Sequence, residues 1–370
     1  MKVFLFGTLL YPPLLQRVSG ARLTLTPAEL PDWRVAGVEG DVYPVLVPDT
    51  GAVAHGAVID VDQDALDRLV HYEDAFGYHA VPVTVLIDGV TTDAQVFRPD
   101  GPGAPPHGEW SLDQWVAQAA PRTMFAADEL MGYFGRFSGA DLQFRRPQAE
   151  ARAHSRVEAT EMSRPLVGSD ASATQVEVQS QTADHAGYFV TETVALRHPT
   201  FAGGLSDTLT REVFVAAEAA IILPYDPVRD RILLVEQFRM GPWRRGATYP
   251  WMLEPVAGRV DPGETPEDTA RREAQEEAGL DLRGIERIGS GYPTPGYSTE
   301  YFHVFLGLCD LPDGIEGLHG EESENEDIRT HVLSWAQAQD LLSRGEANNM
   351  PLILALTWLS HERSRLRASA

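Results

Sequence analysis

The chain has 370 residues, of which 43% are apolar, enough for two globular domains that each bury a core of their own. Its 54 acidic and 30 basic residues give a formal net charge of −24, which argues against nonspecific nucleic-acid binding because phosphate backbones repel such a surface. The single cysteine, Cys309, excludes an internal disulfide and a cysteine-based metal site, and we expect a buried thiol there. Apolar runs are too short for a membrane span or a signal peptide, so we expect a cytoplasmic protein that does not act at a membrane.

The first part of the chain alternates short strands and helices. We predict strands at 3–6 and 55–60, helices at 65–72 and within 111–137, and a loop at the Pro- and Gly-rich run 99–106. The first strand ends at Gly7, Thr8 and Leu9, where a turn would present backbone N–H groups to an anion, although such a strand end is also ordinary. Glu73 follows the helix, and its simplest interpretation is a helix-end carboxylate in contact with water.

The order of these parts resembles the γ-glutamylcyclotransferase-like (AIG2-like) family. The run from Phe6 to Leu9 stands where that family has Tyr-Gly-Thr/Ser-Leu, and Glu73 stands where it has its catalytic glutamate. The resemblance implies a mixed β-barrel with helices, in which this run binds the carboxylate and amine of the substrate and Glu73 is the general acid and base. Tyr78 follows at the family's spacing, whereas Ala80 stands where the family often has arginine. These departures leave the fold intact and the activity open.

The composition shifts between 148 and 174 to Ala, Ser, Arg and Glu, with almost no large apolar side chains. We expect a linker there, in which residues 149–162 could form a short exposed helix. The predicted protein is thus an α+β protein of two domains, with a cyclotransferase-like domain at 1–147, the linker at 148–174 and a second domain at 175–370. In the second domain, strand patterns are strongest at 188–196, 211–223 and 231–238, and helix patterns lie at 335–343 and 351–367.

The most readable stretch of the second domain runs from 258 to 280. Thr265 and Pro266 predict the start of a helix as N-cap and first residue, and Gly279 predicts its end in a left-handed conformation. Three carboxylates project from roughly one face of this helix, those of Glu273, Glu276 and Glu277. A solvated acidic face is the usual explanation, but no lysine is interleaved here, and a divalent cation would relieve the repulsion.

This stretch resembles the Nudix box, G-x5-E-x7-R-E-U-x-E-E-x-G-U, in which U is apolar. Every fixed position is filled, by Gly258, Glu264, Arg272, Glu273, Ala274, Glu276, Glu277, Gly279 and Leu280. A match of this length is far more specific than a short glycine motif. The resemblance implies an α/β/α sandwich that hydrolyses a nucleoside diphosphate linked to another moiety, with this loop and helix at the active site.

Residues outside the box resemble the ADP-ribose pyrophosphatase branch of that family. Pro295 follows the box at the spacing at which this branch has its marker proline, although a loop between strands would also explain it. The resemblance implies substrate contacts from Arg211, Glu212, Arg239, Pro295 and Glu300. The two arginines would donate to phosphate or ribose and Glu300 would contact sugar hydroxyls, whereas surface ion pairing is the simpler structural explanation.

The acidic run 320–328 predicts a flexible loop, and a charge run of this kind is usually just solvated. Its second half, however, resembles the catalytic loop of the ADP-ribose branch. The resemblance implies Glu324 as general base, with Glu321 and Glu322 as rivals. It further implies a metal site with ligands from Glu273, Glu277, Glu326 and the carbonyl of Ala257, with Glu276 and Arg272 as catalytic residues beside them. The expected cofactor is Mg²⁺, for which Mn²⁺ could substitute.

Three functions fit these patterns. The first is Mg²⁺-dependent hydrolysis of ADP-ribose, or a related nucleoside diphosphate sugar, to AMP and ribose 5-phosphate. The second is a γ-glutamyl cyclotransferase-type activity with a regulatory Nudix half. The third is a nucleotide-sugar sensor without turnover, which predicts loss of box glutamates, and none is lost. The expected partner is a small nucleoside diphosphate sugar and neither nucleic acid nor membrane, and the resemblance allows a homodimer.

Overall fold

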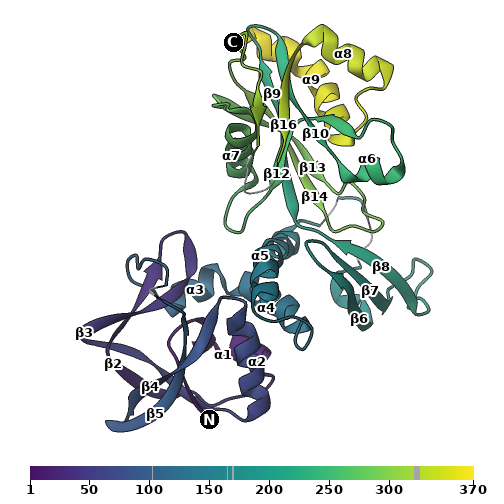
Figure 1. Cartoon of the computed structure of the whole chain (residues 1–370). Coiled ribbons are helices and arrows are strands. Elements are labelled where there is room, and N and C mark those ends of the chain that lie inside the picture. The colour runs from purple at the N-terminus through teal and green to yellow at the C-terminus, as the bar shows by residue number, and fades with distance from the viewer. Residues whose placement is uncertain (102, 165, 169–170, 321–325) are drawn as a thin grey trace. The chain divides into compact units, whose positions relative to one another are not determined.

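The computed structural model describes residues 1–101, 103–164, 166–168, 171–320 and 326–370. The chain divides into two units, the first made of Met1–Asp170 with Ala186–Tyr188 and the second of Ala171–His185 with Phe189–Ala370. Apolar clusters fill the barrel of the first unit and both faces of a sheet in the second. Figure 1 labels the helices and strands of both units.

The first unit is built on a closed β-barrel with the strand order β1-β3-β2-β4-β5 (Figure 1). The strands are β1 (Lys2–Leu5), β2 (Thr26–Val38), β3 (Asp41–Asp60), β4 (Tyr78–Ile87) and β5 (Val90–Pro99). Strand β1 closes the barrel because it pairs antiparallel with β3 and parallel with β5. Phe4, Val58 and Val96 are among the apolar side chains buried inside. The predicted mixed β-barrel is confirmed.

Helices cover this barrel at the end where β1 finishes. They are η1 (Thr8–Leu10), α1 (Pro12–Ser19), α2 (Gln63–Asp74), α3 (Leu112–Gln118), α4 (Ala120–Gly132) and α5 (Ala140–Glu161). Helix α2 begins at Asp62, whose carboxylate accepts the N–H of Ala65 at 2.9 Å as an N-cap. The helix is therefore longer than the predicted 65–72, and Glu73 lies in its last turn rather than after it.

Helix α5 occupies residues 148–161, where the composition indicated a linker. Ala149 and Ser155 are buried in this helix, and Arg152 is buried with its guanidinium bonded to Glu129 of α4 at 2.5 and 3.0 Å. Small side chains let two helices approach closely, so the scarcity of large apolar residues marked a packed helix and not an exposed one. The exact domain boundaries stay a prediction.

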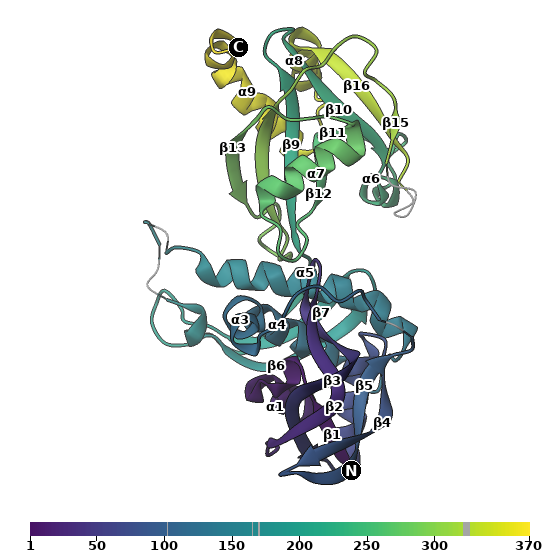
Figure 2. The same ribbon diagram turned by 90° about the vertical axis from the view of Figure 1, so that its left-hand side faces the viewer.

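The second unit contains a mixed sheet with helices on both faces (Figure 2). The strands follow the path β13-β14-β9-β10-β16-β15, with β11 beside β10 and β12 beside β9. Their bounds are β9 (Glu218–Asp226), β10 (Arg231–Phe238), β11 (Trp251–Glu254), β12 (Val256–Arg259), β13 (Gly284–Gly291), β14 (Tyr301–Leu308), β15 (Leu318–His319) and β16 (Ile328–Ser334). Strands β9 and β14 run parallel, and the neighbouring strands otherwise pair antiparallel.

Alternate residues of the central strand β9 point to opposite faces of this sheet. Ala220 and Ile222 pack beneath helix α7 (Pro266–Ala278), where Cys309 is also buried, as predicted. Ile221 and Leu223 pack beneath α8 (Trp335–Arg344) and α9 (Met350–Ala368) on the other face. The short helix α6 (Met240–Arg245) follows β10. The predicted α/β/α sandwich is confirmed.

A separate sheet of β6 (Glu177–Ala186), β7 (Val190–Arg197) and β8 (Leu209–Val215) precedes the sandwich. The pattern at 211–223 predicted one strand, and this prediction was wrong because the chain passes from one sheet to another between β8 and β9. The Thr299 hydroxyl accepts the N–H of Ala216 and donates to its carbonyl, both at 2.8 Å. These bonds occupy the backbone groups of Ala216 and end the strand there.

Gly56 allows β1 and β3 to approach closely, since a Cβ at this position would lie 2.2 Å from the carbonyl oxygen of Leu5. We expect Gly56→Ala to lower the free energy of unfolding of the first unit by about 2 kcal/mol through overpacking, measured by urea unfolding. Gly132→Ala in α4, where a Cβ meets nothing within 4 Å, is the matched control and should be at least as stable as the original protein, because alanine favours a helix more than glycine does. Equal stability of the Gly56→Ala variant would contradict this account of the barrel.

Candidate functional site

Helix α7 presents the box glutamates, and its ends are formed as predicted. Thr265 is the N-cap and its side chain accepts the N–H of Asp268 at 3.2 Å, while Pro266 is the first helical residue. Gly279 ends the helix with a left-handed φ of 63°. These caps fix which residues of the helix face strand β12.

Gly258 and Glu273 hold β12 against α7 at very close range. A Cβ on Gly258 would lie 1.7 Å from Oε1 of Glu273, so only glycine leaves room for this carboxylate. One turn further along α7, Glu277 is 2% exposed and accepts the N–H of Ala257 at 3.1 Å. Two carboxylates of the box therefore lie beside the backbone of residues 257 and 258.

Arg272 forms hydrogen bonds to three carboxylates of the box. Its guanidinium donates to both oxygens of Glu264, at 3.0 and 3.1 Å, to Glu273 at 2.7 Å and to Glu276 at 2.9 Å. Burial alone would raise the pKa of Glu264, but the hydrogen bonds from Arg272 and Thr269 hold this pKa below its usual value. Arg272 thus keeps carboxylates of the loop and of the helix in one arrangement.

The carboxylates of the half-buried Glu273 and the buried Glu277 carry more negative charge than their surroundings balance. Desolvation raises the pKa of Glu277 to about 8, and the charges of Glu273 and Glu326 add to the shift, while Arg239 opposes it. Desolvation also raises the pKa of Glu273 to about 7, although Arg272 opposes the change. Additional positive charge at this place would therefore be favourable.

The chemistry of these donors fits a small divalent cation, which prefers carboxylate and carbonyl oxygens. The three candidate carboxylates Glu273, Glu277 and Glu326 repel one another electrostatically, and Ala257 lies beside them. Across the ranges that the structure describes, no three acidic, histidine or cysteine side chains are already gathered as metal ligands. Glu324 and its rivals Glu321 and Glu322 lie outside the described residues.

Arg239 follows strand β10 and pairs with Glu254 of β11 at 2.5 Å. Because its charge lowers the pKa of Glu277, Arg239 lies near the box glutamates. The structure therefore brings this predicted substrate-binding residue to the box.

The other predicted substrate residues lie on β8 and on the loop between β13 and β14. Arg211 and Glu212 are exposed on β8. Pro295 is exposed in the loop, and Glu300 at the loop's end is half-buried, which raises its pKa. Strand and loop are joined, because Phe214 N–H donates to the Tyr297 carbonyl at 2.7 Å. The chain thus brings β8 and the Pro295 loop together.

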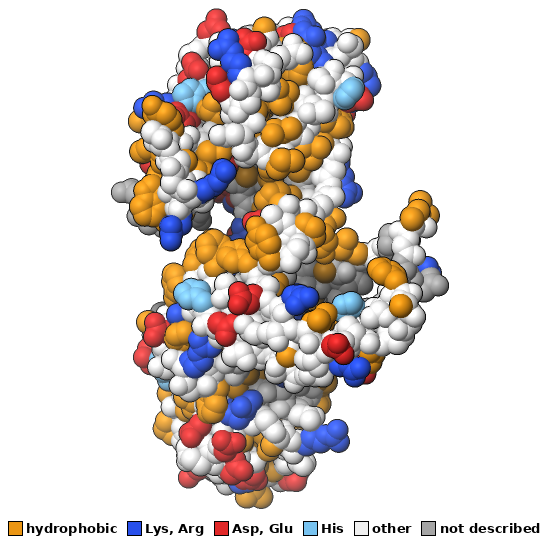
Figure 3. Space-filling view, turned by 90° about the vertical axis from the view of Figure 1, so that its right-hand side faces the viewer, with side chains coloured by type: hydrophobic (Ala, Val, Ile, Leu, Met, Phe, Trp, Pro, Cys, Tyr) orange, Lys and Arg blue, Asp and Glu red, His pale blue; other side chains and the backbone are white. Residues whose placement is uncertain are grey.

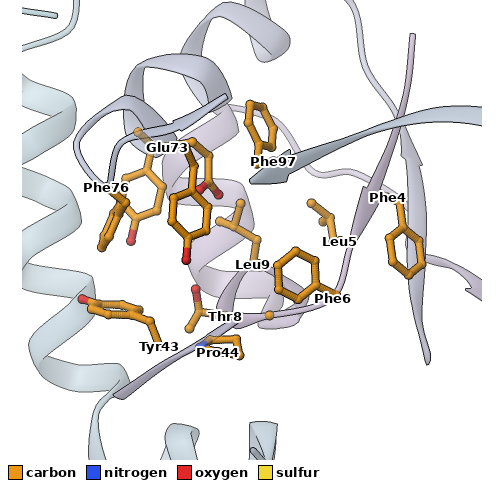
Figure 4. A pocket seen from close by; sticks show the side chains of 13 residues that line it. Phe4, Leu5, Phe6, Thr8, Leu9, Tyr43, Pro44, Glu73, Phe76 and Phe97 are labelled. Carbon is orange, nitrogen blue, oxygen red and sulfur yellow. The ribbon is translucent and has the colours of Figure 1, made fainter. Parts of the chain in front are cut away.

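The first unit contains a cavity of about 60 Å³ at the end of β1, large enough for several small-molecule atoms. The predicted residues Gly7, Thr8, Leu9 and Glu73 all line it, so the structure brings them together (Figure 4). A Cβ on Gly7 would lie 2.8 Å from Cγ of Pro44, which explains the glycine. The remaining walls are mostly aromatic and aliphatic.

Glu73 faces this cavity rather than open water (Figure 4). Desolvation by the surrounding aromatic walls raises its pKa to about 8, so the carboxyl is largely protonated at neutral pH. Burial, followed by the charge of Glu73, also raises the pKa of Tyr78 to about 12. A carboxyl group whose pKa lies near neutrality in a lined cavity is typical of sites that move protons.

Two features of these sites were missed in the sequence. Tyr43 and Phe76 line the barrel cavity, and only the Tyr43-Pro44 pair offered a weak local signal. In the second unit, the buried Glu218 accepts a hydrogen bond from Nε2 of His303 at 2.7 Å. The two are 85 positions apart, so no spacing pattern could have paired them.

Comparison with known proteins follows the same division. Residues 216–356 match the family described as NUDIX domain, and residues 3–112 match the family described as Gamma-glutamyl cyclotransferase, AIG2-like. The ADP-ribose pyrophosphatase of Escherichia coli (strain K12) is 38% identical over 192 residues, covering 52% of this chain and 91% of that protein. The chain belongs to the Nudix family. As a Nudix diphosphatase it is a hydrolase.

Other Nudix relatives match the same half of the chain. The ADP-ribose pyrophosphatase of Haemophilus influenzae is 35% identical over 196 residues, covering 52% of this chain and 90% of that protein. The GDP-mannose pyrophosphatase of Salmonella paratyphi B is 33% identical over 149 residues, covering 40% of this chain and 76% of that protein. A solved ADP compounds hydrolase is 22% identical, with a TM-score of 0.40, and the match covers 54% of this chain and 98% of that one.

Surface features of the Nudix protein agree with a small-molecule substrate. On the face shown in Figure 3, Lys and Arg side chains lie in small groups among acidic and apolar ones. This distribution accords with the net charge of −24 and differs from the basic stripe of a nucleic-acid-binding surface. Within the described part of the chain, no helix combines the length and apolarity needed to cross a membrane.

We expect Gly258→Ala to lower diphosphatase turnover about 100-fold, because the added methyl group would displace the carboxylate of Glu273. The measurement is the release of phosphate monoesters from a nucleoside diphosphate sugar, together with circular dichroism to verify that the variant is folded. Gly241→Ala in α6, where a Cβ meets nothing within 4 Å, is the control and should keep full turnover. A folded Gly258→Ala protein of normal turnover would show that the close approach is unimportant.

The raised pKa of Glu73 predicts a pH-dependent stability of the first unit. Its folded pKa of about 8 exceeds the value of roughly 4.3 expected in the unfolded chain. Between these values the folded unit retains a proton that the unfolded chain releases, so stability falls as pH rises and levels off above pH 8. Unfolding titrations at pH 5 and pH 8 should therefore show Glu73→Gln gaining stability relative to the original protein. The exposed Glu39→Gln control should show no such gain, and a pH-independent difference for Glu73→Gln would refute the shift.

Proposed function

We propose that the second unit hydrolyses the diphosphate bond of ADP-ribose, or of a related nucleoside diphosphate sugar, to AMP and ribose 5-phosphate with Mg²⁺ as cofactor. The observation that carries this proposal is the pair formed by the half-buried Glu273 and the buried Glu277, held beside the backbone of residues 257 and 258 with pKa values of about 7 and 8. Two neighbouring carboxylates bind a divalent cation more readily than a single exposed carboxylate does. The names of the relatives support a nucleoside diphosphate sugar as substrate class.

Each residue of this site has a role in the proposal. Glu273, Glu277, Glu326 and the carbonyl of Ala257 would hold the cation, with Glu276 beside them. When bound, Mg²⁺, or Mn²⁺ in its place, would neutralise the diphosphate and lower the pKa of the attacking water. Glu324 would accept the proton of that water.

The covalent change is a substitution at phosphorus. The water oxygen forms a new bond to phosphorus while the bond to the bridging oxygen breaks, so one diphosphate becomes two phosphate monoesters. Arg272 would keep the carboxylates aligned during this change through the bonds that it makes to Glu264, Glu273 and Glu276. Arg239 would exchange Glu254 for a phosphate oxygen of the substrate.

Recognition of the remaining substrate would come from the joined strand and loop. Arg211 and Glu212 on β8 and Pro295 in the loop would contact the nucleoside and ribose. Glu300 would accept hydrogen bonds from sugar hydroxyls, for which its half-buried position leaves one side accessible.

A second activity is favoured by the cavity of the first unit. We infer a γ-glutamyl cyclotransferase-type reaction, in which the α-amine of a γ-glutamyl compound attacks the γ-carbonyl carbon and the amide bond breaks. The products are 5-oxoproline and a free amine. Glu73 would take a proton from the attacking amine and give one to the leaving amine, and its pKa of about 8 suits both transfers. Gly7, Thr8 and Leu9 would bind the substrate's carboxylate and amine.

The proposed diphosphatase is tested with a panel of ADP-ribose, GDP-mannose and free ADP, assayed with Mg²⁺ and again with a chelator. We expect turnover of ADP-ribose only with the metal, and a loss of at least about 100-fold in Glu277→Gln because one charge of the ligand set is removed. Glu267→Gln, an exposed glutamate of the same helix, is the matched control and should keep full turnover.

The outcomes of this panel separate the three functions. Metal-dependent turnover that Glu277→Gln leaves intact would contradict the proposed site, and absence of turnover on every diphosphate would leave the sensor. Full turnover in Glu324→Gln would move the base to another residue of the same loop. The cyclotransferase activity is tested by incubating the Glu277→Gln and Glu73→Gln variants with a γ-glutamyl amine. We expect Glu277→Gln to release 5-oxoproline and Glu73→Gln to release none.

A further inference from the structure

We propose that helix α5 positions the walls of the barrel cavity, and that Glu150 sets the affinity for the ligand by holding Tyr43. This inference rests on the second activity proposed above, in which the cavity takes a γ-glutamyl compound or 5-oxoproline. Helix α5 spans Ala140–Glu161 and lies outside residues 3–112, which match the cyclotransferase family. Family membership therefore gives this helix no role, and the contacts of the helix have to supply one.

The first turn of α5 binds the residue next to Glu73. The N–H of Gly139, the N-cap of α5, donates to Oδ2 of Asp74 at 2.6 Å, and the side-chain amide of Gln143 donates to the Asp74 carbonyl at 3.3 Å. Asp74 is the last residue of α2, and Glu73 directly precedes it. The start of α5 thus fixes the end of α2 and, with it, the backbone from which Glu73 enters the cavity.

The next turn of α5 covers an aromatic wall of the cavity. The guanidinium carbon of Arg146 lies 4.9 Å from the ring centroid of Phe76, which lines the cavity. Phe76 in turn packs edge-on against Tyr43, with ring centroids 4.9 Å apart. Arg146 also donates to Glu150 at 3.2 Å. Cation, carboxylate and the two rings therefore form one connected wall.

Glu150 completes this wall by accepting the hydroxyl of Tyr43 at 3.1 Å. Figure 4 shows Tyr43 with its hydroxyl at the side of the ring away from Glu73 and the cavity centre. Burial, with the nearby charge of Glu150, raises the pKa of Tyr43, so its hydroxyl stays protonated and remains a donor. The ring of Tyr43, which lines the cavity, is thus held in one orientation before any ligand binds, which reduces the entropy cost of binding.

The test uses the full chain and measures the dissociation constant of 5-oxoproline by isothermal titration calorimetry. We expect Glu150→Ala and Tyr43→Phe each to weaken binding about tenfold, as loss of one hydrogen bond to a charged group predicts. The double variant should bind no more weakly than either single variant, because both remove the same interaction. Glu150→Gln can still accept the Tyr43 hydroxyl and should recover most of the affinity.

Glu158→Ala is the matched control, since Glu158 is exposed on the same helix. It should bind as the original protein does. The proposal is overturned if Glu150→Ala binds 5-oxoproline normally, or if the losses in the two single variants multiply in the double variant. A merely structural role of Glu150 would lower thermal stability without this coupling.

A second measurement needs no ligand and keeps this inference separate from the proposed cyclotransferase activity. N-acetylimidazole acetylates accessible tyrosine hydroxyls, and mass spectrometry of peptides reports the rate at Tyr43. We expect Tyr43 to react several-fold faster in Glu150→Ala than in Glu158→Ala or the original protein. If the original protein does not bind 5-oxoproline but shows this difference, the activity fails and the positioning stands. Equal acetylation rates would overturn the positioning itself.

Discussion

The contact between the Glu273 carboxylate and the backbone of Gly258 is the constraint on which the Nudix site depends. A helix that carries several carboxylates on one face would ordinarily turn them to water, where their repulsion is screened. Here the missing side chain at 258 lets β12 lie against that face, and the Ala257 N–H donates to the carboxylate of Glu277 at 3.1 Å. The strand therefore removes water from the carboxylates, and the raised pKa values follow from that removal.

The two units raise the pKa of a glutamate by different means, which suits them to different chemistry. For Glu73 the cause is desolvation by apolar walls alone, so the group gains by binding a proton. For Glu277 the neighbouring charges of Glu273 and Glu326 add to desolvation, so the same group gains by binding any cation. A lone carboxyl in an apolar cavity is poised for proton transfer, whereas clustered carboxylates are poised for a divalent ion.

Local signals in the sequence were sufficient for much of this fold. Thr265, Pro266 and Gly279 predicted the bounds of α7 because caps and left-handed ends are decided by the residues at those positions. The break between β8 and β9 could not be predicted in this way, because Thr299 makes it from a distant part of the chain. The composition of α5 led to a wrong prediction, because a linker and a closely packed helix both contain few large apolar side chains.

The candidate sites show the same limit. The box glutamates and the Gly7-Thr8-Leu9 run were found because each lies within one short stretch of chain. Tyr43 comes from β3, Phe76 from the turn after α2, and Glu150 from α5, and only tertiary packing brings them together. Residues that lie close together in the sequence could therefore be predicted, whereas residues joined only by tertiary packing could not.

Choice among nucleoside diphosphate sugars has to come from outside the box. ADP-ribose and GDP-mannose contain the same diphosphate group, which is the part that the box would bind. The carboxylates on α7 therefore cannot distinguish the two compounds. The segment that matches the Nudix family begins at residue 216, so β8 lies outside it. Strand β8 and the Pro295 loop bound to it are joined through Phe214 and Tyr297, so a change in one would shift the other. We therefore expect strand β8 and the Pro295 loop to determine which nucleoside is preferred. The box would then hydrolyse whichever diphosphate binds there.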